Sequence, residues 1–183
     1  MQTLTTRQAY ANSWMTVRED AIRLSDGSES IYGVVDKPTY ALVIPRDGDR
    51  LHLVEQFRYP VGVRSWEFPQ GTAPDRAEID PAELAARELA EETGLRAERI
   101  EQIGVLHVAP GMSSQRGHVF LATALTEGPT AREHSEQDMR AAWFTVAEFE
   151  EMARTGELAD SQSLAAYALL QLHDRQGLPQ VDR

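Results

Sequence analysis

The amino-terminal part of the chain alternates polar and apolar residues in short runs, a pattern that predicts β-strands. Residues 13–35 contain two such runs, rich in β-branched and aromatic residues, on either side of an Asp26-Gly27 pair. This pair is a strong hairpin signal. Further along, the apolar runs YALVIP (40–45) and LHLVEQF (51–57) flank a Gly-Asp turn at 48–49. They predict a second hairpin, which enters a central sheet.

A helix with clear boundary signals follows a strand predicted over residues 64–71. Asp80 is a candidate N-cap, Pro81 suits the first helical position, and Gly94 is placed to end the helix. The glutamates of this helix are expected on a different face from its apolar stripe. That stripe is predicted to contain Ala86, Leu89, Ala90 and Thr93.

The second half of the chain alternates predicted strands and helices. Strands are expected over 103–111 and 117–125, and a polar, acidic segment (126–139) then leads to the sequence AAWFTV. A capping pattern at Thr145 and a stop at Gly156 bound the next helix. Residues 161–177 form the last predicted helix, with Leu164, Ala168, Leu169 and Leu172 expected inside. These elements predict an α+β fold in which helices pack on a central sheet.

Composition narrows the classes of function. The length of 183 residues suits one domain with a small appendage, and 42% of the residues are hydrophobic, which allows a substantial core. The absence of cysteine excludes disulfides and zinc–thiolate sites and fits a cytoplasmic protein. No apolar run approaches the length of about 18 residues that a membrane span needs. The net charge of −11 disfavours non-specific nucleic-acid binding.

The sequence RELAEETGL, residues 87–95, raises a chemical question. Glu88, Glu91 and Glu92 share one helical face, where like charges repel by about 0.2–0.5 kcal/mol per pair. Mg²⁺ prefers oxygen ligands and is commonly shared with substrate phosphates. A cation would cancel the repulsion and would let an acidic protein bind a polyanion. The alternative is the solvated acidic face of an ordinary surface helix.

Residues 71–95, GTAPDRAEIDPAELAARELAEETGL, resemble the Nudix box, G-x5-E-x7-R-E-U-x-E-E-x-G-U, where U is apolar. Every fixed position from Arg87 to Leu95 matches. The first half departs, because Gly71 lies two residues further from Arg87 than usual and Glu78 lies one residue too far. The role of Glu78 is therefore left open. The resemblance implies the Nudix fold, an α/β/α sandwich with a central mixed sheet, preceded by N-terminal antiparallel strands.

The resemblance also implies roles within the box. Glu88, Glu91 and Glu92 are expected to hold Mg²⁺, with Mn²⁺ as a substitute, and the main-chain carbonyl of Gln70 is expected to join them. Arg87 is expected to hold a box carboxylate in place rather than to touch substrate. Its alternative is an ordinary surface ion pair. The cations would polarise the phosphoryl group and orient an attacking water.

Outside the box, residues 13–172 are similar to the ADP-ribose pyrophosphatase branch. The similarity lies in the N-terminal strands and in the sequences VEQFRYPVGVRSWEFPQG and APGMSSQRGHVFLA. It implies a strand region over 1–38 that helps to build a homodimer, and a catalytic domain over 39–183. The implied reaction is Mg²⁺-dependent cleavage of ADP-ribose to AMP and ribose 5-phosphate. Ala109 and Gln115 stand where serine and glutamate are common, so another nucleotide sugar, such as GDP-mannose, stays an alternative.

Candidate substrate-binding residues follow from the same similarity. Arg58 corresponds to an arginine that contacts substrate phosphates, and a guanidinium suits bidentate phosphate binding. Its alternative is a surface charge on an edge strand. The further candidates are Arg64, Glu67, Gly111 and Gln115.

A general base is needed to activate water. In this branch a glutamate from a loop after the box supplies the base or completes the metal shell. Glu136 is the first candidate and Glu133 the second, and a solvated loop is the alternative. Two other functions stay open: hydrolysis of dinucleoside polyphosphates or nucleoside triphosphates, and a non-catalytic nucleotide sensor. The intact acidic helix favours an enzyme.

Overall fold

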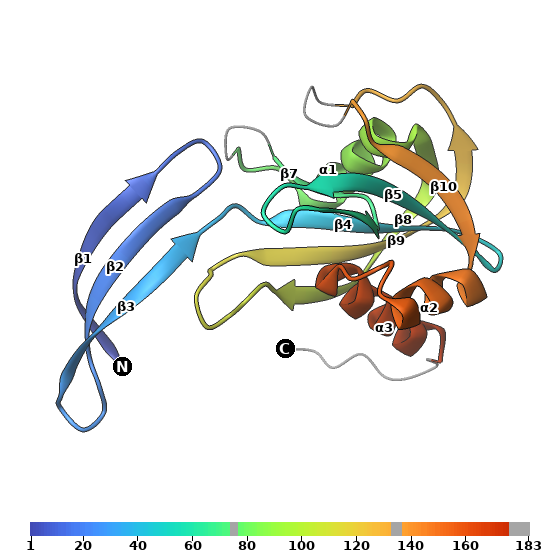
Figure 1. Ribbon diagram of the computed structural model, residues 1–183. Coiled ribbons are helices and arrows are strands. Elements are labelled where there is room, and N and C mark those ends of the chain that lie inside the picture. The colour runs from blue at the N-terminus through green and yellow to red at the C-terminus, as the bar shows by residue number, and fades with distance from the viewer. Residues whose placement is uncertain (74–76, 133–136, 176–183) are drawn as a thin grey trace.

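The computed structural model describes residues 1–73, 77–132 and 137–175, in which two β-sheets form (Figure 1). The first is a three-stranded antiparallel sheet of β1 (Gln2–Ala11), β2 (Thr16–Arg23) and β3 (Glu29–Asp36). The β2–β3 hairpin turns at the predicted Asp26-Gly27 pair. β1 was not predicted, because its polar residues are nearly all exposed and show no buried face.

The second sheet is mixed, and its central order is β10-β5-β4-β9-β8. β4 and β9 run parallel, and the other neighbours along this path are antiparallel. β8 begins directly after Gly94 rather than at the predicted residue 103, and it ends before the predicted residue 111. The strands of the path are β4 (Tyr40–Asp47), β5 (Arg50–Arg58), β8 (Leu95–His107), β9 (Arg116–Glu127) and β10 (Arg140–Thr145).

β4 and β5 diverge after their hairpin, and the divergence makes room for the candidate site. The two strands pair over Arg46–Asp47 and Arg50–Leu51. Beyond this point β6 (Val63–Glu67) pairs with β5, and β7 (Gln70–Thr72) pairs with β4. The chain therefore crosses from one diverging strand to the other between β6 and β7.

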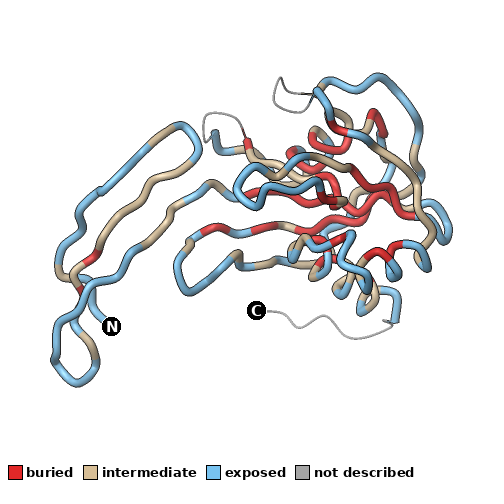
Figure 2. Tube along the Cα trace, viewed as in Figure 1, coloured by how far each residue is buried: buried red, intermediate tan, exposed pale blue. Residues whose placement is uncertain are grey.

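Helices cover both faces of the second sheet (Figure 1). α1 (Pro81–Glu88) packs on one face, and α2 (Val146–Thr155) and α3 (Ser161–Asp174) pack on the other. β4 is buried on both faces, which explains its continuous apolar run. Figure 2 shows that buried residues concentrate in this layered body, whereas the N-terminal sheet is largely exposed or half-buried. The predicted α+β class, with helices on a mixed sheet and antiparallel N-terminal strands, is confirmed.

α1 turns a face to the core that differs in part from the predicted stripe. Leu84, Ala85 and Leu89 are buried, whereas Ala86 is exposed. The other two residues of the predicted stripe are half-buried. Alanines and leucines occur at many positions of this helix, so more than one face has apolar residues at helical spacing. The sequence pattern therefore did not determine which face is buried.

The rotation of α3 was also predicted wrongly. Its buried residues are Ser163, Ala166 and Leu170. The helix carries apolar residues on most of its surface, so the pattern did not select one face. On the buried face the hydroxyl of Ser163 accepts a hydrogen bond from the N–H of Phe68 at 2.8 Å, and Ala166 and Leu170 pack in the core. Of the residues expected inside, Leu169 is half-buried, and the others are exposed (Leu164, Ala168 and Leu172). In the described part of the chain no helix combines the length and apolarity that crossing a membrane requires.

His52 in β5 gives the fold a pH dependence. Its side chain is buried, its Nδ1 has no hydrogen-bond partner within the described residues, and its ring meets Trp143 edge to face at 4.8 Å. Burial lowers the pKa of His52 from 6.5 to about 4. Because the unfolded state binds more protons between these values, stability falls as the pH drops from 6.5 towards 4.

His52 alone should therefore lower the free energy of unfolding by about 1.3 kcal/mol between pH 7.5 and pH 5.5, measured by urea denaturation. The variant His52→Phe keeps an aromatic ring against Trp143 and removes the titrating group. Between pH 7.5 and pH 5.5, the free energy of unfolding of this variant should fall by about 1.3 kcal/mol less than that of the wild type. Equal losses in the two proteins would contradict the role of His52.

Candidate active site

The acidic helix forms with the predicted boundaries. Asp80 caps α1 by accepting hydrogen bonds from two N–H groups of the first turn, at 2.9 and 3.2 Å, and Pro81 starts the helix. Gly94 ends the helical segment in the left-handed conformation, with a φ of 75°. Local sequence signals therefore suffice to place both ends of the segment that carries the glutamates.

The last turn of the acidic helix is a π-turn, η2 (Leu89–Thr93), and turns of this kind are frequent at functional sites. The glutamates divide into two groups. Glu88 and Glu92 are buried, at 8% and 1% exposure. Glu91 is half-buried and accepts a hydrogen bond from Arg87 Nε at 2.8 Å, so Arg87 holds a box carboxylate.

β7 lies directly against the two buried carboxylates. A Cβ on Gly71 would lie within 2.6 Å of Glu88 Oε1, so only glycine leaves room for the carboxylate. The N–H of Gln70 donates to Glu92 Oε2 at 3.2 Å. These two contacts join the crossing between β6 and β7 to the acidic helix.

The register of β7 orients the main-chain carbonyl of Gln70. The N–H of Val43 donates to the carbonyl of Pro69 at 2.9 Å, and Gln70 stands opposite Leu42, one position further along. In an antiparallel ladder, the residue next to a bonded position turns both its N–H and its carbonyl away from the partner strand. Because the N–H of Gln70 reaches Glu92 on that side, its carbonyl faces the acidic helix too.

The oxygen atoms at this edge suit a hard divalent cation. Within residues 1–73, 77–132 and 137–175, however, no group of three or more Asp, Glu, His or Cys side chains is arranged to hold a metal ion. Glu91 is paired with Arg87, and the carboxylates of Glu88 and Glu92 and the carbonyl of Gln70 make up one oxygen set. The chemistry of this set fits Mg²⁺, which commonly keeps several waters and needs few protein ligands.

Arg58 and Glu67 form a bidentate ion pair where the crossing begins. Arg58 Nε donates to Glu67 Oε2 at 3.0 Å, and Arg58 Nη2 donates to Oε1, which also accepts from Gln56 Nε2 at 2.7 Å. Burial raises the pKa of Glu67, and the charge of Arg58 opposes that rise. The Arg58 side chain is 39% exposed, and Nη1 makes no hydrogen bond within the described residues.

Arg64 belongs to a different cluster from Arg58. Successive side chains of β6 alternate between faces, so Arg64 and Glu67 lie on opposite faces of the strand. Arg64 donates to Glu55 at 2.8 Å and to Asp138 at 2.6 Å, and both contacts raise its pKa. The structure thus brings the candidates Arg58 and Glu67 together. The third candidate, Arg64, lies apart from them, with Glu55 and Asp138.

Gly111 and Gln115 lie in the loop that links β8 to β9. The carbonyl of Gly111 accepts a hydrogen bond from the hydroxyl of Tyr32 at 2.8 Å, and the buried Gln115 side chain donates to the carbonyl of Pro38 at 3.0 Å. Ala109, in the same loop, has a positive φ of 46°. The loop is thereby fixed to β3 and to the link between the two sheets.

The segment after β9 returns to the acidic helix, a contact that the sequence did not reveal. The N–H of Ala131 donates to the carbonyl of Glu91, and Arg132 Nε donates to the carbonyl of Glu92, both at 3.0 Å. Partners 40 residues apart in the chain leave no local pattern. The candidate bases that follow this anchor, Glu133 and Glu136, lie outside the described residues.

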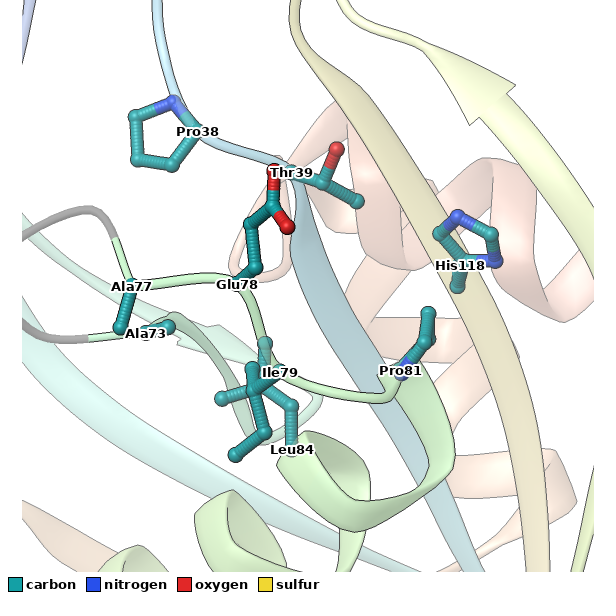
Figure 3. A pocket seen from close by; sticks show the side chains of 9 residues that line it. All are labelled: Pro38, Thr39, Ala73, Ala77, Glu78, Ile79, Pro81, Leu84 and His118. Atoms are coloured by element: carbon teal, nitrogen blue, oxygen red, sulfur yellow. The ribbon is translucent and has the colours of Figure 1, made fainter.

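A cavity of about 300 Å³ lies beside the start of α1. Figure 3 shows Glu78 on its wall, with the carboxylate directed towards Thr39 at the start of β4. His118, Pro81 and Leu84 also line the cavity. Glu78, whose role the altered loop spacing left open, therefore lies before the helix and not on the face that carries Glu88 and Glu92.

The layered sheet and the acidic helix define a Nudix hydrolase, and the chain belongs to this family. The NUDIX domain family matches residues 36–167. The nucleoside diphosphate sugar hydrolase N-terminal domain family matches residues 1–35, the segment that contains β1, β2 and most of β3.

The relatives point to one branch. The ADP-ribose pyrophosphatase of Mycobacterium tuberculosis is 33% identical over 90% of this chain and 80% of its own. The ADP-ribose pyrophosphatase of Bacillus subtilis is 27% identical over 94% of each chain. A crystal structure described as an ADP compounds hydrolase superposes with a TM-score of 0.82 over 93% of this chain and 91% of that chain, at 18% identity. This last likeness shows the fold alone.

Gly71→Ala should displace the Glu88 carboxylate and lower turnover of the nucleotide sugar by about a hundredfold, with cooperative unfolding retained. Activity assays and thermal melting followed by circular dichroism measure the two effects. Gly33→Ala is the matched control, because nothing lies within 4 Å of a Cβ added to Gly33. Full turnover in Gly71→Ala would show that the position of Glu88 does not matter for catalysis.

Proposed function

We propose that the protein hydrolyses the pyrophosphate bond of ADP-ribose, giving AMP and ribose 5-phosphate. The observation that supports it most is the contact of buried Glu92 with the N–H of Gln70, because the strand geometry then directs the Gln70 carbonyl to the same side as that N–H. Support for the substrate comes from the nucleoside diphosphate sugar hydrolase N-terminal domain and from the two ADP-ribose pyrophosphatases among the relatives.

In the proposed reaction, the oxygen of a water attacks one phosphorus, and the bridging P–O bond breaks. Mg²⁺ bound at the site would polarise a phosphoryl oxygen and lower the pKa of a water. Glu88, Glu92 and the carbonyl of Gln70 would hold the cation in this proposal, and Glu91, which accepts a hydrogen bond from Arg87, would be a further ligand. Mn²⁺ would serve the same oxygen ligands.

Arg58 binds phosphate in the proposed reaction. Glu67 holds one edge of the guanidinium, and the exposed side with Nη1 stays available for a phosphate oxygen. Glu136 is proposed as the general base that takes the proton of the water, with Glu133 as second candidate. The anchoring of Ala131 and Arg132 to the end of the acidic helix supports a base from this segment.

Glu92→Gln should lower turnover of ADP-ribose by at least about a hundredfold, because it removes one charge from the cation site. The amide oxygen can still accept from the N–H of Gln70, so the melting temperature should change little. Glu98→Gln, at an exposed position of β8, is the matched control. EDTA should abolish AMP release, and Mg²⁺ should restore it.

The same assay separates the alternatives. If GDP-mannose or a dinucleoside polyphosphate were hydrolysed faster than ADP-ribose, that compound would be the better candidate for the substrate. Tight binding of ADP-ribose without any product, in the presence of Mg²⁺, would favour the nucleotide sensor. Full activity of Glu92→Gln would refute the role of the acidic helix.

We also propose that residues 1–38 form a dimerisation region and residues 39–183 the catalytic domain. The N-terminal sheet exposes large apolar side chains, among them Trp14 at 71% and Ile31 at 68%, and a second copy would cover them. A cytoplasmic location, consistent with a chain that lacks cysteine, is part of the same proposal.

Ile31→Glu should convert a homodimer into a monomer, because it places a charge in the proposed interface. Light scattering coupled to size-exclusion chromatography measures the mass. Leu172→Glu, on the outer face of α3, is the control for an exposed apolar residue outside the N-terminal sheet. A monomeric wild type, or an unchanged mass of Ile31→Glu, would contradict the proposed interface.

A further inference from the structure

The crossing between β6 and β7 is held by the first turn of α3. The hydroxyl of Ser163 accepts from the N–H of Phe68 at 2.8 Å and donates to Asp160 Oδ2 at 2.7 Å. The same oxygen of Asp160 accepts from the N–H of Ser163 at 2.8 Å, which makes Asp160 the N-cap of α3. Ser163 is fully buried, so these bonds form away from solvent.

Asp160 makes one contact that capping does not require. Its Oδ2 accepts a hydrogen bond from Gln70 Nε2 at 3.2 Å. The N–H of Gln70 is meanwhile bound to Glu92 at 3.2 Å. Gln70 is thus tied through its side chain to α3 and through its main chain to the acidic helix.

The two ties restrict the rotation of Gln70 about the axis of β7. In an extended strand the N–H and the carbonyl of one residue point the same way, so a rotation of the whole residue that turned the carbonyl away from the acidic helix would also strain the bonds to Glu92 and to Asp160. The neighbouring Pro69 is fixed independently, because its carbonyl accepts from Val43 in β4. Side chains that orient metal ligands commonly affect metal affinity by about 10- to 100-fold.

We propose that Asp160 is a positioning residue for the divalent-cation site, acting through the Gln70 side chain on the Gln70 carbonyl. This role rests on the proposed function, because it assumes that the carbonyl is a cation ligand. Asp160 itself touches neither cation nor substrate. A capping residue alone would stabilise α3 and leave cation affinity unchanged, and that difference is measurable.

Two variants cut the tie from opposite ends. Gln70→Leu removes the side-chain amide and leaves the main chain and the α3 cap in place. Asp160→Ser keeps a good N-cap but is too short to reach Gln70. Binding of Mn²⁺ to the substrate-free protein, measured by electron paramagnetic resonance, should weaken about tenfold in each variant. The double variant should bind no more weakly than either single variant, because both remove the same contact.

Two further variants test specificity. Asp160→Asn keeps an oxygen for all three donors, so its affinity for Mn²⁺ should stay within about threefold of the wild type. Gln162→Leu makes the same chemical change as Gln70→Leu, but at the second residue of α3. It should leave the affinity for Mn²⁺ unchanged. Melting temperatures of all variants show whether any loss comes from unfolding.

Wild-type affinity for Mn²⁺ in folded Gln70→Leu and Asp160→Ser would overturn the positioning role while leaving the proposed function intact. An equal loss of Mn²⁺ affinity in Asp160→Asn and Asp160→Ser would also overturn the positioning role, because the contact between residue 160 and the Gln70 side chain would then not be the cause of the loss. If the wild type binds no Mn²⁺ and releases no AMP, the proposed function itself fails. The outcomes are therefore distinguishable.

Discussion

Burial of negative charge where the central strands β4 and β5 diverge is the constraint on which the rest of this structure depends. Glu67, Glu88 and Glu92 are all less than a tenth exposed, in a chain whose net charge is already −11. An ionised carboxylate is costly to bury unless hydrogen bonds or opposite charges compensate it. Glu67 receives Arg58 and Gln56, and Glu92 receives a main-chain N–H.

The topology supplies these partners because two central strands diverge. β6 pairs with β5, and β7 pairs with β4. The chain must therefore cross the gap between these two strands, and the crossing brings main-chain groups to the acidic helix. Gly71 admits the Glu88 carboxylate, and the ladder register turns Gln70 outwards. Loss of the divergence would place β4 and β5 side by side and leave the glutamates facing a continuous ladder. The divergence of the two strands therefore determines which groups meet at the candidate site.

The sequence predicts what local signals determine. The cap at Asp80, the stop at Gly94 and the spacing of Glu88, Glu91 and Glu92 lie within fifteen residues, and the structure shows both boundaries where these signals placed them. What the sequence hides are contacts between distant residues. Asp160 and Gln70 are 90 residues apart, and Phe68 and Ser163 are 95 residues apart. The apolar residues of α3 indicate no single face. Exposed β1, without a buried face, likewise leaves no period to detect.

In the proposed reaction, the pairing of Arg58 with Glu67 would let an acidic chain orient a phosphate without a broad basic surface. A guanidinium fixed along one edge loses less side-chain freedom when its other edge meets a phosphate, so less binding free energy is lost to ordering. The same carboxylate, however, offsets the positive charge of Arg58. Arg58 alone would therefore neutralise little of a diphosphate, and in the proposed reaction most of that task would fall to divalent cations. In this proposal the geometry of the arginine would provide orientation, and the buried glutamates would hold the neutralising charge.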